Sequence, residues 1–253
     1  MKLKYILPLL LPAVAALAGD EPKAKPKQPA RPEAPRTIPD DFQPDPSWKA
    51  LGRSLWFDPA QKRLVLRARV ALREGALEHL LCREQTKEHE SILATDASPR
   101  MIHAGLILTG AQPGHPVRFQ PKFEPPAGTP ITIELEWTSP EGERQKANAR
   151  QWVRDVKTRK PLDTDWVFAG SDLFEDPDTK QTIYAADGGD LFTVSNFTAS
   201  ILDLPFASSA DDTSRGFEAD PRQVPPRGTH VTMSLRPATA HERPKARRAS
   251  RVD

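Results

Sequence analysis

The segment Cys82–Leu93 concentrates side chains that could do chemistry: the single cysteine of the chain, one of its six histidines, and the carboxylates of Glu88 and Glu90. An imidazole beside a thiol lowers the thiol pKa and favours the nucleophilic thiolate. A nearby carboxylate can serve as general acid or base. Cys82, His89 and Glu90 are therefore candidate catalytic residues, with Glu88 as a further candidate acid or base.

Four of the six histidines, His79, His89, His103 and His115, lie between residues 79 and 115. Thiolate and imidazole are ligands of transition metals, so Cys82, His89 and His103 form a candidate metal site that His79 or His115 could join. The spacings Cys-x6-His and His-x13-His match no standard zinc pattern. The alternative to a metal site is a structural interpretation, in which the thiol and the imidazoles contribute to packing and the charged residues between them are solvated.

The segment Gly75–Leu93 has to position these side chains, and two backbones fit it. Its Ala, Leu, Glu, Lys and Gln content favours a helix, which places Cys82 and His89 on one face. Alternatively, Leu77–Cys82 and His89–Ala94 are two strands of a hairpin. Both backbones predict that the thiol and the imidazole are neighbours.

Strands dominate the rest of the pattern. Arg63–Arg73 and Ile131–Trp137 alternate apolar with charged or polar residues, which indicates half-buried strands. The arginines of the first and the glutamates of the second are expected to face each other across neighbouring strands. The apolar residues of Val231–Leu235 predict a closing strand.

Two glycine-containing segments predict hairpins. Asp187–Asp190 separates the apolar runs Ile183–Ala186 and Leu191–Asn196, and Ser139–Gly142 forms a similar corner. Aspartates are common in turns and the spacing matches no calcium loop, so Asp187 and Asp190 are interpreted as turn residues.

One helix is expected near residues 99–110, with Ser98 as its cap and Gly110 at its end. Apolar residues surround most of its circumference, which predicts deep burial. His103 lies in this apolar run and reads as a hydrogen-bonded core residue more readily than as a ligand. A second short helix over Gln151–Val156 would place a tryptophan, Trp152, against the core.

The two ends differ from the centre in composition. Residues 1–18 have a charged start, an apolar run and an Ala-Leu-Ala end, which predicts a secretory signal peptide. Residues 19–46 are rich in Pro and Lys and predict a disordered linker, and residues 237–253 predict a disordered basic tail. The remaining residues, 47–236, are expected to form one mainly β (α+β) domain with an antiparallel sheet and one buried helix.

Charge, cysteine content and hydropathy argue against a nucleic-acid-binding, a disulfide-bonded or a membrane-spanning protein. The 36 Lys and Arg against 34 Asp and Glu become balanced once Lys2 and Lys4 leave with the signal, so no general attraction to nucleic acid is expected. One cysteine cannot form an internal disulfide. No second long apolar run exists, so no transmembrane segment is expected after cleavage, and export to the periplasm or the extracellular space is predicted.

Several segments resemble the YdjY-domain family, whose members are largely exported bacterial proteins without an established activity. The resemblance implies export and a single domain, and it supplies no reaction. Arg83–Thr86 departs from the turn residues of the family, so the choice between helix and hairpin stays open. The resembling segments are Cys82 with Lys87–Leu93, Ile102–Leu106, Gly110–Val117, Gln151–Lys157, Trp166–Ser171, Ala186–Asp190, Ser195–Phe197 and Ile201–Pro205.

The expected function is that of an extracytoplasmic binding or interaction module whose partner is an envelope component or another protein. The alternative is a small enzyme that depends on a transition metal or on a thiol and uses Cys82, His89 and His103. A third interpretation assigns the binding of an anionic polymer to the basic tail.

Overall fold

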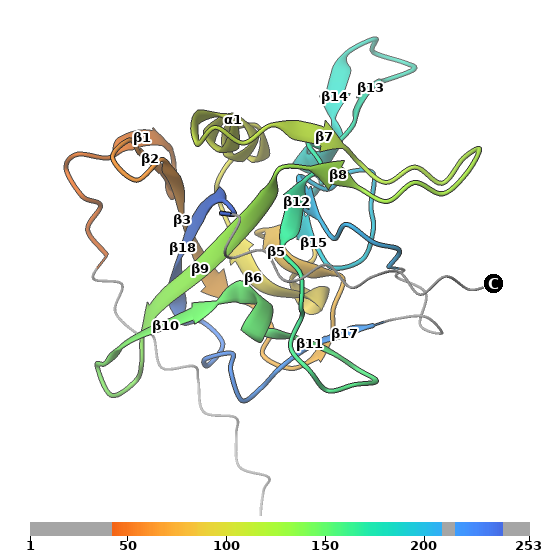
Figure 1. Cartoon of the computed structure of the whole chain (residues 1–253). Helices are drawn as coiled ribbons and strands as arrows, with labels where there is room; N and C mark the ends of the chain where they lie inside the picture. The colour runs from red at the N-terminus through yellow and green to blue at the C-terminus, as the bar shows by residue number, and fades with distance from the viewer. Residues whose placement is uncertain (1–41, 209–215, 240–253) are drawn as a thin grey trace, which may run out of the picture. The chain divides into compact units, whose positions relative to one another are not determined.

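Three long neighbouring strands, whose apolar residues alternate with polar ones, form one side of the fold (Figure 1). The computed structural model describes residues 42–208 and 216–239, which all belong to one compact unit. The strands are β3 (Arg63–Val70), β9 (Pro130–Thr138) and β18 (His230–Pro237). Leu64 and Leu66 are fully buried in β3, whereas Arg67 and Arg69 reach the surface, as the alternation predicts.

The closing strand β18 lies between β3 and β9 and pairs antiparallel with both. The predicted face-to-face pairing of arginines and glutamates is therefore wrong, because a strand separates them. The arginines of β3 instead bind hydroxyl groups of β18. Arg67 donates a hydrogen bond to Thr232 Oγ1 at 2.6 Å, and Arg63 donates one to Ser234 Oγ at 3.2 Å.

The sheet closes on itself among the described residues. Its strand order is β3, β18, β9, β12, β16, β15, β5, β6, and β6 pairs back onto β3 at Arg69 with Ala94 and Val70 with Leu93. Closure leaves these eight strands without an exposed edge and surrounds a core rich in leucine and aromatic side chains. The remaining members are β12 (Trp166–Phe168), β16 (Leu202–Asp203), β15 (Asp190–Thr193), β5 (His79–Arg83) and β6 (Ser91–Thr95).

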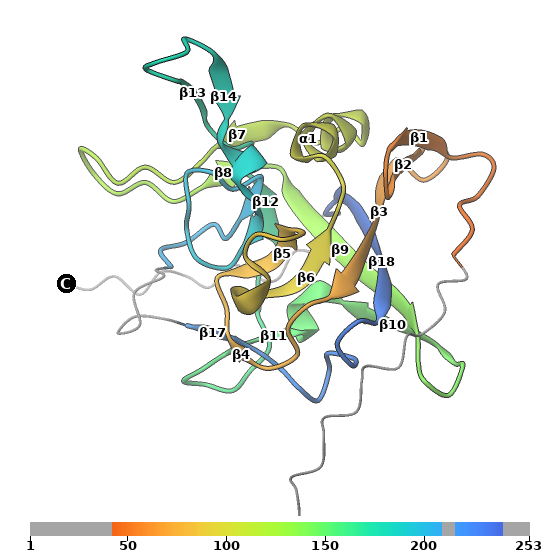
Figure 2. The ribbon, with the colours of Figure 1, turned by 180° about the vertical axis from the view of Figure 1, so that it is seen from behind.

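The prediction of a purely antiparallel sheet is wrong at two pairs, β5 with β6 and β15 with β16, which run parallel. Gly75–Leu93 therefore forms neither a helix nor a hairpin. It contains the short strand β4 (Gly75–Ala76), the strand β5 and the start of β6. The 3-10 turn η1 (Glu88–Glu90) lies between β5 and β6, and Figure 2 shows these two strands side by side. The parallel register sets His79 opposite Ser91 and Cys82 opposite Ala94.

Further strands extend this sheet or form small sheets of their own. The sheet also includes β1 (Lys49–Gly52), β2 (Leu55–Asp58) and β10 (Arg144–Asn148). One small sheet contains β11 (Val153–Asp155), β17 (Phe217–Ala219) and β4 (Gly75–Ala76). A second consists of β13 (Leu173–Glu175) and β14 (Thr182–Tyr184). A third consists of β7 (Pro113–His115) and β8 (Ala127–Gly128).

The helix α1 spans Pro99–Leu108 as predicted, with Ser98 at the N-cap position although its side chain makes no capping hydrogen bond. It packs beside β2 and β3 (Figure 1). The prediction of deep burial holds for one face only. Ile102 and Leu106 are fully buried, whereas Met101, Ile107 and Leu108 are exposed, because α1 contacts the barrel along a single stripe.

The two predicted hairpins have different outcomes. Ser139–Gly142 connects β9 to β10, and Ser139 N donates to Glu143 O at 2.8 Å, so this prediction is confirmed. The hairpin around Asp187–Asp190 is wrong. β14 pairs with β13, whereas β15 pairs with β5 and β16, so the 3-10 turn η3 (Ala185–Gly188) links two different sheets.

The predicted helix over Gln151–Val156 is also wrong. A 3-10 turn, η2 (Ala149–Gln151), leads directly into β11. The predicted burial of Trp152 is confirmed, because its side chain is fully buried and packs edge-on against Trp137 with ring centroids 5.2 Å apart.

The predicted signal peptide, most of the linker and most of the tail lie outside the described residues. Within them, Phe42 packs against Trp48 and Trp56, so the end of the predicted linker, from residue 42 onward, belongs to the folded domain. At the other end, Ala238 is buried next to β18. No helix among residues 42–208 and 216–239 is both long and apolar enough to span a bilayer.

Candidate functional site

Cys82 lies on β5 with its side chain in the protein interior, in a small apolar cluster with Ala71 and Ala94. Burial raises the pKa of its thiol, and hydrogen bonding from Ser91 and from the backbone of Lys87 only partly opposes this effect. The thiol therefore stays protonated near neutral pH, which does not suit a nucleophile or a metal ligand.

His89 lies on η1 and points into solvent, with 77% of its side chain exposed. Its Nε2 atom is 3.7 Å from Glu90 Oε2. The prediction that the imidazole of His89 and the thiol of Cys82 are neighbours is wrong. The strand β5 directs Cys82 into the interior, whereas the 3-10 turn η1 places His89 in solvent.

His103 lies on α1, where its Nδ1 atom is 2.9 Å from the Tyr184 hydroxyl. The same hydroxyl donates to Gly170 O at 3.1 Å, and the His103 ring packs edge-on against Phe168. Burial lowers the pKa of His103. His103 is therefore a hydrogen-bonded residue of the core, as the sequence favoured. Cys82, His89 and His103 do not come together in one coordination site.

A different histidine lies at the centre of a polar cluster. His79, at the start of β5, is completely buried, and its Nε2 atom lies 2.8 Å from Asp190 Oδ1. Lys87 Nζ lies 3.0 Å from the same oxygen. The antiparallel pairing of β15 with β5 brings Asp190 to this position.

The charges of this cluster stabilise one another. Burial acts to raise the pKa of Asp190, but hydrogen bonds and charge from His79 and Lys87 outweigh it and lower the pKa. Burial acts to lower the pKa of Lys87, but the carboxylate of Asp190 outweighs it, with contributions from Glu90 and Glu78, and raises the pKa. Asp190 is therefore ionised and Lys87 is protonated over the physiological pH range.

Two further carboxylates flank His79. One oxygen each from Glu78 and Glu90 and one ring nitrogen of His79 all lie within 4.8 Å of one another. Both glutamates are half-buried. Their backbones are tied together, because Glu78 N donates to Glu90 O at 3.1 Å. These are the donor atoms with which the described residues could hold a metal ion.

The phenyl ring of Phe197 stacks on the face of the His79 imidazole and restricts its orientation. The two rings are nearly parallel, at 7°, with centroids 5.5 Å apart, and Lys87 Nζ lies over the same phenyl ring at 5.6 Å. The backbone N–H of Phe197 donates to the buried carboxylate of Asp203 at 3.3 Å. Asp203 thereby helps to hold the phenyl ring against His79.

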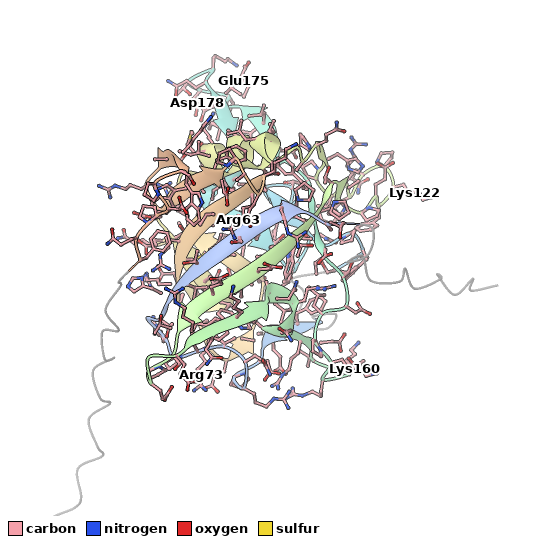
Figure 3. The ribbon with its side chains drawn as sticks, turned by 60° about the vertical axis from the view of Figure 1, so that its left-hand side comes forward. Arg63, Arg73, Lys122, Lys160, Glu175 and Asp178 are labelled. Atoms are coloured by element: carbon pink, nitrogen blue, oxygen red, sulfur yellow. The ribbon has the colours of Figure 1, made fainter. Side chains whose placement is uncertain are left out.

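A second site is a groove of about 460 Å³ on the outer surface of β3, β18 and β9. We call it the strand-face groove, and Figure 3 shows Arg63 at the middle of this surface. Two arginines stack on aromatic rings there: the guanidinium of Arg67 lies 4.5 Å from the Phe42 centroid, and that of Arg63 lies 5.4 Å from the Trp48 centroid. The exposed side chain of Arg144 lines the same groove.

Sequence reasoning missed most of the polar cluster. It named Glu90, treated His79 only as an addition to another site, and interpreted Asp190 as a turn residue. His79 and Asp190 are 111 positions apart, so no local spacing could have joined them. The available signal was the density of resembling segments, since Lys87–Leu93, Ala186–Asp190 and Ser195–Phe197 all meet here.

Comparison with known proteins identifies the family of the chain. Neither the curated proteins nor the solved structures gave a match. The model of the YdjY domain matches residues 55–236, from the second strand of the large sheet to the penultimate residue of β18. This range contains the polar cluster and most of the strand-face groove, and it covers more than half of the chain. The chain therefore belongs to the YdjY-domain family.

Proposed function

We propose that this protein is an exported binding module whose strand-face groove binds an acidic saccharide. The single observation that carries the proposal is the arrangement of guanidinium groups beside aromatic rings in one hollow of the sheet surface. Export rests on the sequence of residues 1–18, which lie outside the described part of the chain.

The size and chemistry of the groove support this ligand class. Its volume of about 460 Å³ lies within the range of small-molecule sites. Guanidinium groups bind carboxylates with paired hydrogen bonds, and the half-exposed ring of Trp48 offers an apolar face to the C–H surface of a sugar. Hydroxyl groups of Thr232 and Ser234 add polar contacts.

The charge of the groove favours an anionic over a neutral ligand. Three arginines line it against one glutamate. Arg63 is paired with Asp58 at 3.0 Å and Glu136 with Lys146 at 2.8 Å. Arg67 and Arg144 give the groove its positive character. Catalysis by Cys82, His89 and His103 receives no such support, because these residues lie in three separate environments.

The test is a calorimetric titration of the full chain with tri-galacturonate, using neutral maltotriose for comparison. We expect the acidic trisaccharide to bind and Arg144→Glu to weaken it about tenfold or more, since a hydrogen bond to a charged group contributes about 1.5–3 kcal/mol. The matched control is Lys122→Glu, which makes the same charge change on a loop away from the groove (Figure 3).

Equal binding of both trisaccharides would contradict the proposal, as would an Arg144→Glu variant that binds like the wild type. Binding of a glutamate-rich peptide in place of the saccharide would replace the proposed ligand class.

A further inference from the structure

We propose that Glu78, His79 and Glu90 form a binding site for a divalent transition-metal ion. One ring nitrogen of His79 and one carboxylate oxygen from each glutamate lie within 4.8 Å of one another. Ligand atoms lie about 2.0–2.2 Å from an ion such as Zn²⁺. To reach that distance from a common point, the three donor atoms have to come closer together, which we assign to rotation of the two half-buried glutamate side chains.

The hydrogen bond to Asp190 determines which nitrogen of His79 is the ligand. An ionised carboxylate only accepts hydrogen bonds, so the contact of 2.8 Å between Nε2 and Asp190 Oδ1 requires the hydrogen on Nε2. In the uncharged form of the ring, Nδ1 is then the nitrogen with the lone pair, and a metal ion binds this form. Nδ1 is completely buried and has no hydrogen-bond partner, which is costly unless another group, such as a metal ion, binds it.

The second contact of His79 is the one that metal-bound histidines usually make. Such residues commonly donate their other ring N–H to a carboxylate, which fixes the tautomer and increases the basicity of the coordinating nitrogen. Asp190 supplies this carboxylate and is itself held by Lys87 at 3.0 Å. Phe197 stacks on the ring at 5.5 Å, so the orientation of the imidazole is fixed before any ion binds.

The ligand set selects the class of ion. Calcium and magnesium are bound mainly by oxygen, whereas imidazole together with carboxylates suits Zn²⁺ and its neighbours. Three protein ligands leave a position open for water or a further ligand, as in catalytic zinc sites.

The charge of the cluster also favours a divalent cation. Among the described residues, Glu78, Glu90 and Asp190 bring three carboxylates to the His79 ring, whereas the ammonium group of Lys87 is paired with Asp190. Half-buried carboxylates gain most from a counter-ion that replaces lost solvation.

The test is a calorimetric titration of the full chain with Zn²⁺. We expect one ion to bind per chain, and Glu90→Gln, which keeps the shape of the side chain, to weaken binding about tenfold or more. The matched control is His89→Gln, which removes an exposed histidine next to Glu90 and should leave the affinity unchanged.

A nitrogen-detected NMR titration of the wild type provides a readout that does not depend on a variant. We expect Zn²⁺ to shift the Nδ1 resonance of His79 strongly and to leave Nε2 protonated. Absence of a one-to-one complex, an unchanged Nδ1 resonance, or wild-type affinity in Glu90→Gln would each overturn the proposal.

Discussion

At the scale of single residues, Asp203 is a buried carboxyl group in an uncharged surrounding of hydrogen-bond donors. Burial raises its pKa to about 7, and hydrogen bonds from Asn196 and from the backbone of Leu204 only partly offset the effect. The bonds measure 3.1 Å to Asn196 Nδ2 and 2.7 Å to Leu204 N. The carboxyl group therefore titrates near neutral pH in the folded protein.

This shift predicts a pH dependence of stability. The pKa of Asp203 is higher in the folded protein than the ordinary value of 3.8, so the folded state binds the proton more tightly. The stabilising contribution is complete below about pH 4 and is lost as the pH rises to about 7. Urea unfolding at a series of pH values measures this effect.

We expect the free energy of unfolding of the wild type, relative to Asp203→Asn, to fall by on the order of a few kcal/mol across this range and then to level off. The comparison with Asp203→Asn removes the opposite contribution of carboxylates with lowered pKa, such as Asp190. A difference between the two proteins that is constant with pH would contradict the assignment.

At the scale of the elements, the packing of α1 against the barrel depends on Gly105. This residue is buried within the helix. A Cβ atom placed there would overlap Leu64 Cδ1 and lie 3.1 Å from Leu51 Cδ1. The close approach of α1 to β3 therefore requires a residue without a side chain.

Gly105→Ala tests this packing, because two effects oppose each other. Alanine favours a helix over glycine by about 1 kcal/mol, whereas overpacking a core costs about 1–3 kcal/mol. Since Leu64 is fully buried and has little room to move, we expect net destabilisation of about 1–2 kcal/mol in chemical denaturation.

Gly188→Ala is the matched control, since a Cβ atom at Gly188 meets nothing within 4 Å. Its stability should stay close to that of the wild type. A Gly105→Ala variant that is as stable as this control would show that α1 can move away from β3.

At the scale of the whole molecule, closure of the barrel distributes stability unevenly among the described strands. β18 has a paired strand on each side. In contrast, β13 and β14 pair only with each other and carry the exposed side chains of Leu173 and Phe174. Segments with few buried contacts open without global unfolding.

Hydrogen–deuterium exchange measured by mass spectrometry tests this contrast. We expect amides of β18 to exchange only on global unfolding, and amides of β13 and β14 to exchange orders of magnitude faster. Comparable protection of the two regions would mean that the β13–β14 hairpin has a partner that covers it.

The amino-acid sequence by itself determined those features that depend on neighbours along the chain. Period-two alternation located β3, β9 and β18, and breakers located the ends of α1. The resemblance of several segments also identified the family, which the match over residues 55–236 confirms.

The tertiary structure decided which strands are neighbours, and with them the candidate sites. The parallel pairing of β5 with β6 turned Cys82 inward and left His89 in solvent, while the pairing of β15 with β5 brought Asp190 to His79. The physical reason is that backbone hydrogen bonds between strands are the same for almost any sequence. Partner and direction are set by burial of the whole core, which no local segment of the sequence specifies.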